Sequence, residues 1–369
     1  MTFSDIRAAI DGRIRPLKGE IIPLLAAYGR VSAGSISSRR NMPPFDVSAL
    51  DGYGVRGEGT RFELIGDLSP FVPVPARLKG GEAFFVPTGG RIPQGSRFVM
   101  REHVTEEGRR IRVETGADER RVVKKGDWLR RGSRVVDKGG LFTPSTMALA
   151  ALAGIRKVPV YARPAVAVIT TGSELKKGRM VNSNAFLLAG LIQRDGGQVL
   201  GLYTADDEEE EIRALVERLG AADLLVLTGG TSQGKKDLTR QAIRRSGGRI
   251  LLDAPPVMPG RTMAFGRKGT TPFFILPGNP RAIRTLYEVF VKRGLLTMAG
   301  RMPAERSHRL PLPGDVKKPA DMIAVVPVLL RHGQAAIAEL HPSEPNGFIV
   351  LEQEPEHLSA GAMVRVLET

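Results

Sequence analysis

The chain has 369 residues, 42% of them apolar, and this length allows about two to four domains with hydrophobic cores. It contains no cysteine, which excludes disulfides, thiolate metal sites and cysteine nucleophiles, and its five histidines show no metal-ligand spacing. No run approaches the roughly 18 apolar residues of a membrane helix. The N-terminus also lacks a signal-peptide core, so we expect a cytoplasmic protein without membrane contact.

The net charge of +15 raises the possibility of a nucleic-acid partner, but the arginines and lysines occur in small scattered groups. Aromatic residues, which could stack on bases, make up only 5% of the chain, and no nucleic-acid module is recognisable. The sequence therefore disfavours nucleic-acid binding. An anionic small ligand explains the positive charge equally well. A solvated basic face is the simpler interpretation of most of these residues.

The first part of the chain predicts helices and then a β domain. Apolar spacing favours two short helices, over 3–12 and 19–28. Residues 41–125 contain short alternating runs separated by proline and glycine, the pattern of an inserted small β domain. A strand and a helix follow in 126–163, and we group this segment with 1–40 as a helical, linking domain.

Residues 164–300 alternate strands and helices, which predicts a doubly wound, mostly parallel sheet. Ligands of such sheets bind beyond the carboxyl ends of the strands, where the loops 170–174, 228–237 and 276–280 lie. Short strands with prolines over 301–369 predict a C-terminal β-barrel or sandwich. The expected fold class is thus a multidomain α/β protein with additional β domains.

The loop TGGTSQGKKD over 228–237 allows three interpretations. A P-loop would need a hydroxyl where Lys236 stands, and a nucleophile elbow with Ser232 at its tip would need a histidine base that the sequence does not place. The third interpretation is a glycine-rich cradle for oxyanions at a helix N-terminus, carrying one carboxylate, Asp237. Helix capping is the structural alternative for Asp237.

Several motifs together resemble the molybdopterin molybdenumtransferases, the MoeA proteins and the E domain of gephyrin. They are NMPPFDVSALDGYGVRG (41–57), PTGGRIPQG (87–95), TTGSEL (170–175) followed by Asn182 and Asn184, GGTSQGKKD and LPGNP. The resemblance covers essentially the whole chain. It implies a four-part architecture with a MogA-like α/β domain for molybdopterin at 164–300, and a homodimer whose active site combines this domain with the DGY segment of the other subunit.

The family's reaction inserts molybdate into the dithiolene of adenylylated molybdopterin, with Mg²⁺, and releases AMP. The resemblance therefore implies molybdopterin adenylyltransferase and apo-molybdoenzymes, or their chaperones, as partners. Asp51, Glu174 and Asp237 are the implied magnesium ligands and, with Arg261, the catalytic residues, since Mg²⁺ prefers hard oxygen ligands. The implied substrate-binding residues are Thr88, Gly229, Gly230, Ser232, Gly234, Pro277, Gly278, Pro280 and Ser343. The LPGNP turn could also be only a stiff loop.

The sequence departs from the family pattern at three places. Met258 and Arg261 stand where the family's KPGKP segment has lysines, which removes one cation. Trp128 occupies the position of a functional aspartate. The segment 341–352 is shorter than the family's pterin-contacting stretch and leaves Ser343 and Asn346 as remnants.

Two hypotheses follow from these departures. The first is a molybdenumtransferase with an altered ion site, for molybdate or another oxyanion such as tungstate. The second is a non-catalytic paralogue that binds molybdopterin and serves as a carrier or assembly partner.

Overall fold

The computed structural model describes residues 1–67, 77–116, 119–230, 237–302, 306–338, 345–352 and 354–368. The chain forms two compact units. Unit 1 comprises Met1–Glu20, Gly29–Ala33 and Pro159–Thr369, and unit 2 comprises Ile21–Tyr28 and Gly34–Val158.

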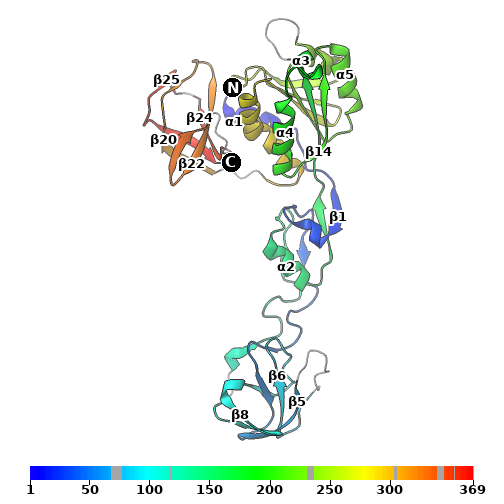
Figure 1. Cartoon of the computed structure of the whole chain (residues 1–369), viewed down its shortest axis with the longest axis vertical. Coiled ribbons are helices and arrows are strands. Elements are labelled where there is room, and N and C mark those ends of the chain that lie inside the picture. The colour runs from blue at the N-terminus through cyan, green and yellow to red at the C-terminus, as the bar shows by residue number, and fades with distance from the viewer. Residues whose placement is uncertain are drawn as a thin grey trace. The chain divides into compact units, whose positions relative to one another are not determined.

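A six-stranded sheet forms the centre of unit 1, in the order β14-β13-β15-β19-β18-β16 (Figure 1). Its strands are β13 (Ala165–Thr171), β14 (Gln198–Ala205), β15 (Leu224–Thr228), β16 (Arg249–Asp253), β18 (Ala264–Lys268) and β19 (Thr271–Leu276). β13 pairs in parallel with β14 and β15, and β15 with β19, whereas β18 pairs antiparallel with its two neighbours. The expected mostly parallel sheet is confirmed.

Helices cover both faces of this sheet because its central strands are apolar on both sides. They are α1 (Phe3–Asp11), α3 (Ser173–Lys176), α4 (Ser183–Arg194), α5 (Glu209–Arg218), α6 (Leu238–Arg245), α7 (Pro280–Leu286), the π-helical turn η4 (Tyr287–Val291) and α8 (Lys292–Met298). Side chains of α1, α4, α7 and α8 share one core with Val166 and Val168. Side chains of α5 and α6 share another with Ala167 and Ile169.

The predicted helix over 19–28 is wrong, although the one over 3–12 is confirmed as α1. Residues Gly19–Pro23 form the strand β1, which pairs with β12 (Lys157–Tyr161), and Leu24–Ala27 form only a 3₁₀ turn, η1. Proline lacks the N–H group that a helix interior needs, and Pro23 adopts an extended conformation with ψ of 143°. α1 instead begins with a complete capping box between Thr2 and Asp5.

A buried polar network joins α4 to the turn after α7. The Glu288 side chain lies 2.6 Å from Arg194 of α4 and 3.2 Å from Lys292, and Glu288 is only 3% exposed. The neighbouring Tyr287 donates a 2.9 Å hydrogen bond from its hydroxyl to the carbonyl of Leu191, and burial raises the pKa of this phenol. These contacts join the C-terminal end of α4 to the turn η4 that follows α7.

The C-terminal region of unit 1 is a second sheet, in the order β17-β22-β24-β26-β20, with β23 beside β22. It attaches to the α/β part where β17 pairs in parallel with β22. The strands are β17 (Val257–Met258), β20 (Arg306–Pro311), β22 (Ile323–Arg331), β23 (Gln334–Ile337), β24 (Gly347–Leu351) and β26 (Met363–Glu368), with β21 (Val316–Lys317) and β25 (His357–Leu358) as a separate pair.

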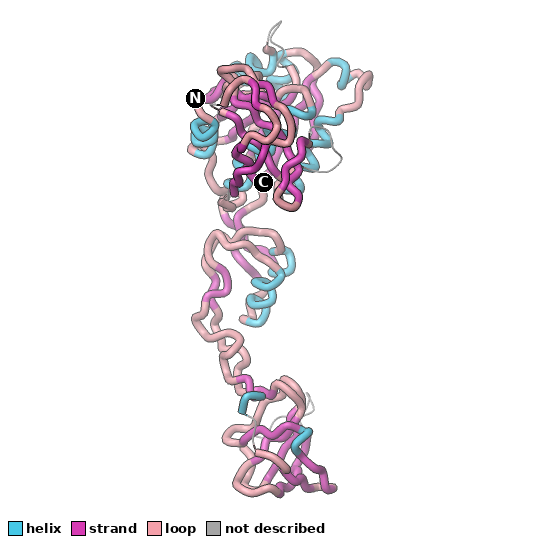
Figure 2. Tube along the Cα trace, turned by 90° about the vertical axis from the view of Figure 1, so that its left-hand side faces the viewer, coloured by secondary structure: helices cyan, strands magenta, loops and turns pink. Residues whose placement is uncertain are grey.

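Unit 2 consists mainly of strands and loops, with α2 (Pro144–Leu152) as its longest described helix (Figure 2). Its main sheet has the order β7-β4-β6-β5-β9-β8. These strands are β4 (Gly52–Val55), β5 (Arg61–Asp67), β6 (Glu82–Val86), β7 (Arg97–Met100), β8 (Val104–Glu107) and β9 (Arg110–Val113). The smaller elements are β2 (Ile36–Ser37), β3 (Val47–Ser48), η2 (Arg101–His103), η3 (Glu119–Arg121), β10 (Val122–Val123) and β11 (Arg134–Val136).

Two matched substitutions test whether α1 is part of the core of unit 1. Ile6 is 0% exposed whereas Ile21 is 73% exposed. We expect Ile6→Ala to lower the free energy of unfolding by about 2–5 kcal/mol, because it leaves a cavity. Ile21→Ala should change it by no more than about 0.5 kcal/mol. Urea unfolding followed by circular dichroism measures both, and equal effects would contradict the packing of α1.

Candidate functional site

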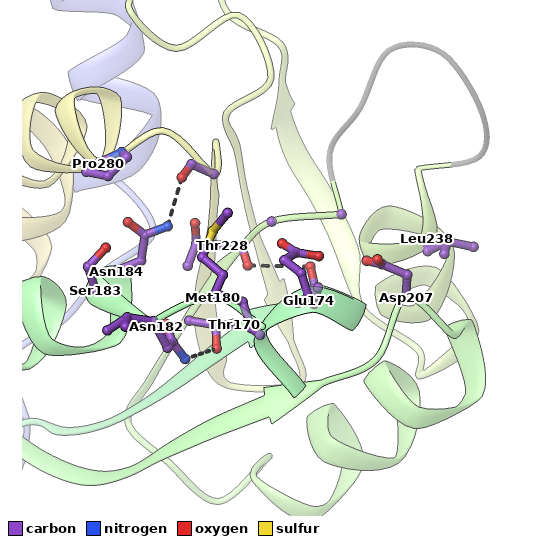
Figure 3. Close-up of a pocket in the computed structure, with 17 residues that line it drawn as sticks. Thr170, Glu174, Met180, Asn182, Ser183, Asn184, Asp207, Thr228, Leu238 and Pro280 are labelled. Atoms are coloured by element: carbon purple, nitrogen blue, oxygen red, sulfur yellow. Dashed lines mark hydrogen bonds between the residues drawn. The ribbon is translucent and has the colours of Figure 1, made fainter. Parts of the chain in front are cut away.

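A cavity of ≈ 530 Å³ lies at the carboxyl ends of β13, β15 and β19 (Figure 3). Its lining residues are Thr170, Thr171, Gly172, Glu174, Leu175, Met180, Val181, Asn182, Ser183, Asn184, Asp207, Thr228, Gly229, Gly230, Leu238, Gly278 and Pro280. They come from the strand ends and from the first residues of α3, α4, α6 and α7. The cavity is therefore at the edge where a doubly wound sheet binds its ligands.

Two glycines let the loop after β15 lie directly against the end of β13. Gly229 and Gly230 have φ of 92° and 64°, a region that strongly favours glycine. A Cβ atom at Gly229 would lie 2.4 Å from the carbonyl oxygen of Thr171, and one at Gly230 would lie 2.6 Å from the hydroxyl oxygen of Thr239. The sequence requires glycine here for space as well as for conformation.

Two asparagines at the start of α4 fix the opposite side of the cavity. Asn182 caps α4, accepting a 3.2 Å hydrogen bond from the N–H of Ala185, and its amide donates to the hydroxyl of Thr170 at 2.7 Å. Asn184 donates to the carbonyl of Gly278 at 2.8 Å (Figure 3). Its own carbonyl oxygen is buried and accepts no hydrogen bond from the described residues.

The carboxylates of the cavity are Glu174 and Asp207, both exposed. Asp207 accepts a 3.1 Å hydrogen bond from the N–H of Ser173. The adjacent Asp206 accepts hydrogen bonds from the Ser173 hydroxyl and from the Asp207 N–H, and these lower the pKa of Asp206. Asp206 and Asp207 directly follow β14, so the rule that ligands bind at carboxyl strand ends would have found Asp207, which sequence reasoning missed.

Asp237 is a helix cap, as the structural alternative supposed. It accepts a 3.0 Å hydrogen bond from the N–H of Arg240, and its other oxygen forms an ion pair with the guanidinium of the same residue. Arg240 is 8% exposed and is also bonded to Asp253 at 2.8 Å. Both oxygens of Asp237 are thus engaged within the protein, although its neighbour Leu238 lines the cavity.

The structure brings part of the predicted site together. Of the predicted residues, Glu174, Gly229, Gly230, Gly278 and Pro280 line the cavity. Pro277 lies beside it and accepts a 2.8 Å hydrogen bond through its carbonyl from Thr228. Ser232, Gly234 and Ser343 lie outside the described residues. The sequence predicts no role for Asn182, Ser183 and Asn184, although Asn182 and Asn184 follow the TTGSEL motif that carries the family resemblance.

Asp51 and Thr88 belong to unit 2, where they bind each other. One oxygen of Asp51 accepts hydrogen bonds from the N–H of Thr88 at 2.7 Å and from its hydroxyl at 2.8 Å. These two bonds, the backbone one first, lower the pKa of Asp51.

The residues that depart from the family pattern occupy different surroundings. Arg261 is exposed and does not line the 530 Å³ cavity. Met258 lines a second cavity of ≈ 340 Å³ in unit 1, whose ionisable lining residues are Arg281, Arg284, Lys317 and Asp315. The cation expected at position 258 is absent, but three others share its cavity.

The two remaining departures lie on other parts of the chain. Trp128, in unit 2, is 51% exposed. Asn346 holds both the N–H and the carbonyl of Leu330, which gives it a structural role.

Two further observations concern metals and membranes. Among the described residues, no group of three or more histidine or acidic side chains could hold a metal ion by itself. No helix in the described part of the chain combines the length and the apolar character that crossing a membrane requires.

Two family models match the sequence. Residues 1–154 match the model described as "MoeA N-terminal region (domain I and II)", and residues 167–297 match "Probable molybdopterin binding domain". Molybdopterin molybdenumtransferase of Synechococcus elongatus is 30% identical over 82% of this chain and 81% of its own length. Molybdopterin molybdenumtransferase 2 of Mycobacterium tuberculosis is 26% identical over 94% of both chains.

The structure is also similar to solved structures. The molybdopterin biosynthesis MoeA protein of Pyrococcus horikoshii superposes with a TM-score of 0.83 at 27% identity, covering 100% of this chain and 98% of that one. A second crystal structure of the MoeA protein from this organism gives a TM-score of 0.78 at 25% identity, with 100% of both chains covered. The likeness extends over the whole chain.

The Asp51–Thr88 contact predicts a measurable pH dependence. Because the folded pKa of Asp51 is lowered, its contribution to stability is present above the unfolded pKa and is lost as pH falls through the folded pKa. Thr88→Val removes the hydroxyl donor and keeps the N–H, so we expect the pKa of Asp51 to rise part of the way to its ordinary value. Carboxyl chemical shifts followed by NMR across a pH titration measure it. Thr88→Ser should leave the pKa low, and an unchanged pKa in Thr88→Val would contradict the assignment.

Proposed function

This chain belongs to the molybdopterin molybdenumtransferase family, and we propose that it inserts molybdate into adenylylated molybdopterin in the 530 Å³ cavity and releases AMP. The protein is therefore an enzyme of molybdenum cofactor biosynthesis. The relatives named as molybdenumtransferases favour this activity over a carrier without turnover. The observation that carries the proposal is the cavity itself, where polar strand ends and helix N-termini meet.

The geometry of the cavity suits a substrate that carries phosphate groups. α4 and α6 both begin at its wall, and a helix N-terminus attracts anions through its N–H groups and its dipole. The backbone at Gly229, Gly230 and Gly278 has no side chain to keep a ligand away. We assign the phosphate groups of the substrate to this side of the cavity, and the buried acceptor of Asn184 to an N–H or O–H group of the same molecule.

Glu174 and Asp207 fit a magnesium ion that is shared with the substrate. Mg²⁺ usually takes one or two carboxylates, substrate phosphate oxygens and water, rather than a complete protein cage. Two exposed carboxylates in one cavity match that requirement, and they agree with the absence of a larger acidic cluster among the described residues. When bound, the ion would offset the charge that develops on phosphate oxygens. Asp237 contributes by positioning the start of α6.

Three cationic side chains lie in the same cavity as Met258. Arg281, Arg284 and Lys317 line the cavity that Met258 also lines, and arginine can bind an oxyanion through two hydrogen bonds. We propose that these residues concentrate molybdate or tungstate. In the overall reaction the two dithiolene sulfurs displace two oxygens of the oxyanion, which leave as water, and a water molecule hydrolyses the phosphoanhydride bond to release AMP.

Homodimer formation and a cytoplasmic location complete the proposal. Leu25 and Tyr28 of unit 2 are 89% and 66% exposed, which suits a surface covered by a second copy. Molybdopterin adenylyltransferase would supply the substrate, and apo-molybdoenzymes or their chaperones would receive the product. The roles of Asp51 in magnesium binding and catalysis, of Thr88 in substrate binding and of Arg261 in catalysis stay predictions.

Release of AMP from adenylylated molybdopterin, with Mg²⁺ and with or without molybdate or tungstate, tests the activity. We expect release stimulated by the oxyanion. Glu174→Gln and Asp207→Asn should each reduce the rate by about 100-fold. Replacing a residue that only hydrogen-bonds to a metal ligand already lowers activity by up to about 100-fold, so a direct ligand should matter at least as much. Each should also weaken Mg²⁺ binding measured by calorimetry in the presence of the substrate.

Asp321→Asn is the matched control, because Asp321 is exposed and lines none of the cavities described here. Its rate should stay within about twofold of the natural protein. Saturable substrate binding without AMP release, with either oxyanion, would contradict the transferase proposal.

Sedimentation analysis tests the dimer. Introducing charge with Leu25→Asp and Tyr28→Asp should raise the dissociation constant of the dimer by at least about tenfold, because an unpaired charge in an interface is costly. Met302→Asp places the same charge on another exposed apolar residue, 87% exposed, and should leave the constant unchanged. A monomeric natural protein would refute this part of the proposal.

A further inference from the structure

A third cavity, of ≈ 540 Å³, lies at the opposite edge of the α/β sheet. It is bordered by the loop after α1, by the residues that lead into β15, and by the turn between β18 and β19. Its lining residues include Arg13, Arg15, Asp223, Arg267, Thr270 and Pro272. The amino ends of β15 and β19 face this cavity, whereas their carboxyl ends face the proposed active site. The two sites are therefore distinct within unit 1.

The ionisable side chains of this third cavity are mostly basic. Three arginines and one aspartate line it, which leaves a formal charge of +2. Asp223 is engaged elsewhere, since it accepts a 2.8 Å hydrogen bond from the N–H of Ala165. Arg13, Arg15 and Arg267 form no ion pair with any residue in the described ranges. Their charge is therefore not offset by an ion pair within the part of the chain that the structure describes.

Of the three arginines, Arg267 has the surroundings that most favour a bound anion. Its Nε atom is buried and has no hydrogen-bond partner among the described residues. Arg267 also pairs directly with Arg249 across the antiparallel strands β16 and β18, where like charges destabilise a sheet. A buried guanidinium donor without an acceptor is costly. An anion in this cavity would accept from Arg267 and offset both penalties.

We propose that this third cavity binds an organic phosphate, with Arg13 and Arg267 gripping the phosphate group. A phosphate monoester carries about two negative charges near neutral pH, which matches the cavity, and guanidinium groups bind phosphate oxygens through paired hydrogen bonds. The volume favours an organic phosphate ester over inorganic phosphate, because cavities of about 300–1,000 Å³ are large enough for whole small molecules. The site does not depend on the proposed transferase function.

Calorimetric titration with ribose 5-phosphate, ribose and inorganic phosphate tests this inference on the full chain. We expect saturable binding of ribose 5-phosphate, no binding of ribose, and inorganic phosphate weaker by at least about tenfold. The Arg13→Gln, Arg267→Gln double variant should bind ribose 5-phosphate at least about tenfold more weakly. Glu174→Gln should bind it normally, because that residue lines the other cavity.

Arg309→Gln is the charge-matched control, since Arg309 is exposed on β20 and lines none of the cavities. Thermal unfolding checks that the variants fold, and the single variant Arg13→Gln keeps the test valid if the half-buried Arg267 cannot be replaced. No saturable binding, equal binding by Arg13→Gln and Arg309→Gln, or equal affinity for inorganic phosphate would each overturn the inference.

Discussion

The close approach of the Gly229–Gly230 backbone to Thr171 is the constraint on which the proposed active site depends. No side chain fits between these segments, so the ends of β13 and β15 meet with bare backbone between them. The hydroxyl of Thr228 then bonds the carbonyl of Pro277, which ties the third strand end to the same place. A sheet that buries apolar strands from both faces thereby ends in a compact polar edge.

The polar residues at this edge differ in how many of their side-chain atoms are bonded within the protein. Asn182 uses its amide for a helix cap and for a bond to Thr170, so it is committed to the protein. Asn184 donates to Gly278 and keeps one buried acceptor without a partner among the described residues. Asp237 caps α6 with one oxygen and pairs with Arg240 through the other. Residues of one motif can therefore differ in role, and only the partners of each atom separate them.

Much of the fold followed from the sequence, because the signals involved are local. Apolar strands and glycine stops predicted the α/β alternation and the position of the ligand edge. The helix predicted over 19–28 is wrong for two reasons. Pro23 interrupts the helical pattern, and residues 19–23 pair instead with β12, a strand distant in sequence. The surroundings of Met258 could not be predicted either. Met258 lies on β17, which pairs with β22, and Lys317 lines the same cavity. Contacts between segments so far apart in the chain leave no local pattern in the sequence.

The bonds between α4 and the turn after α7 bear on how the cavity can adapt to a ligand. Both helices present their first turns to the cavity, while Glu288 and Arg194 join them at the remote ends, and Asn184 bonds Gly278 at the near end. Fastened at two points, they form one rigid wall. Adjustment to substrate is then left to the facing side, where exposed Glu174 lies in the four-residue helix α3 and exposed Asp207 lies in the connection after β14. The wall formed by α4 and α7 thus sets the shape that a ligand must match, and the wall with Glu174 and Asp207 adjusts to the ligand.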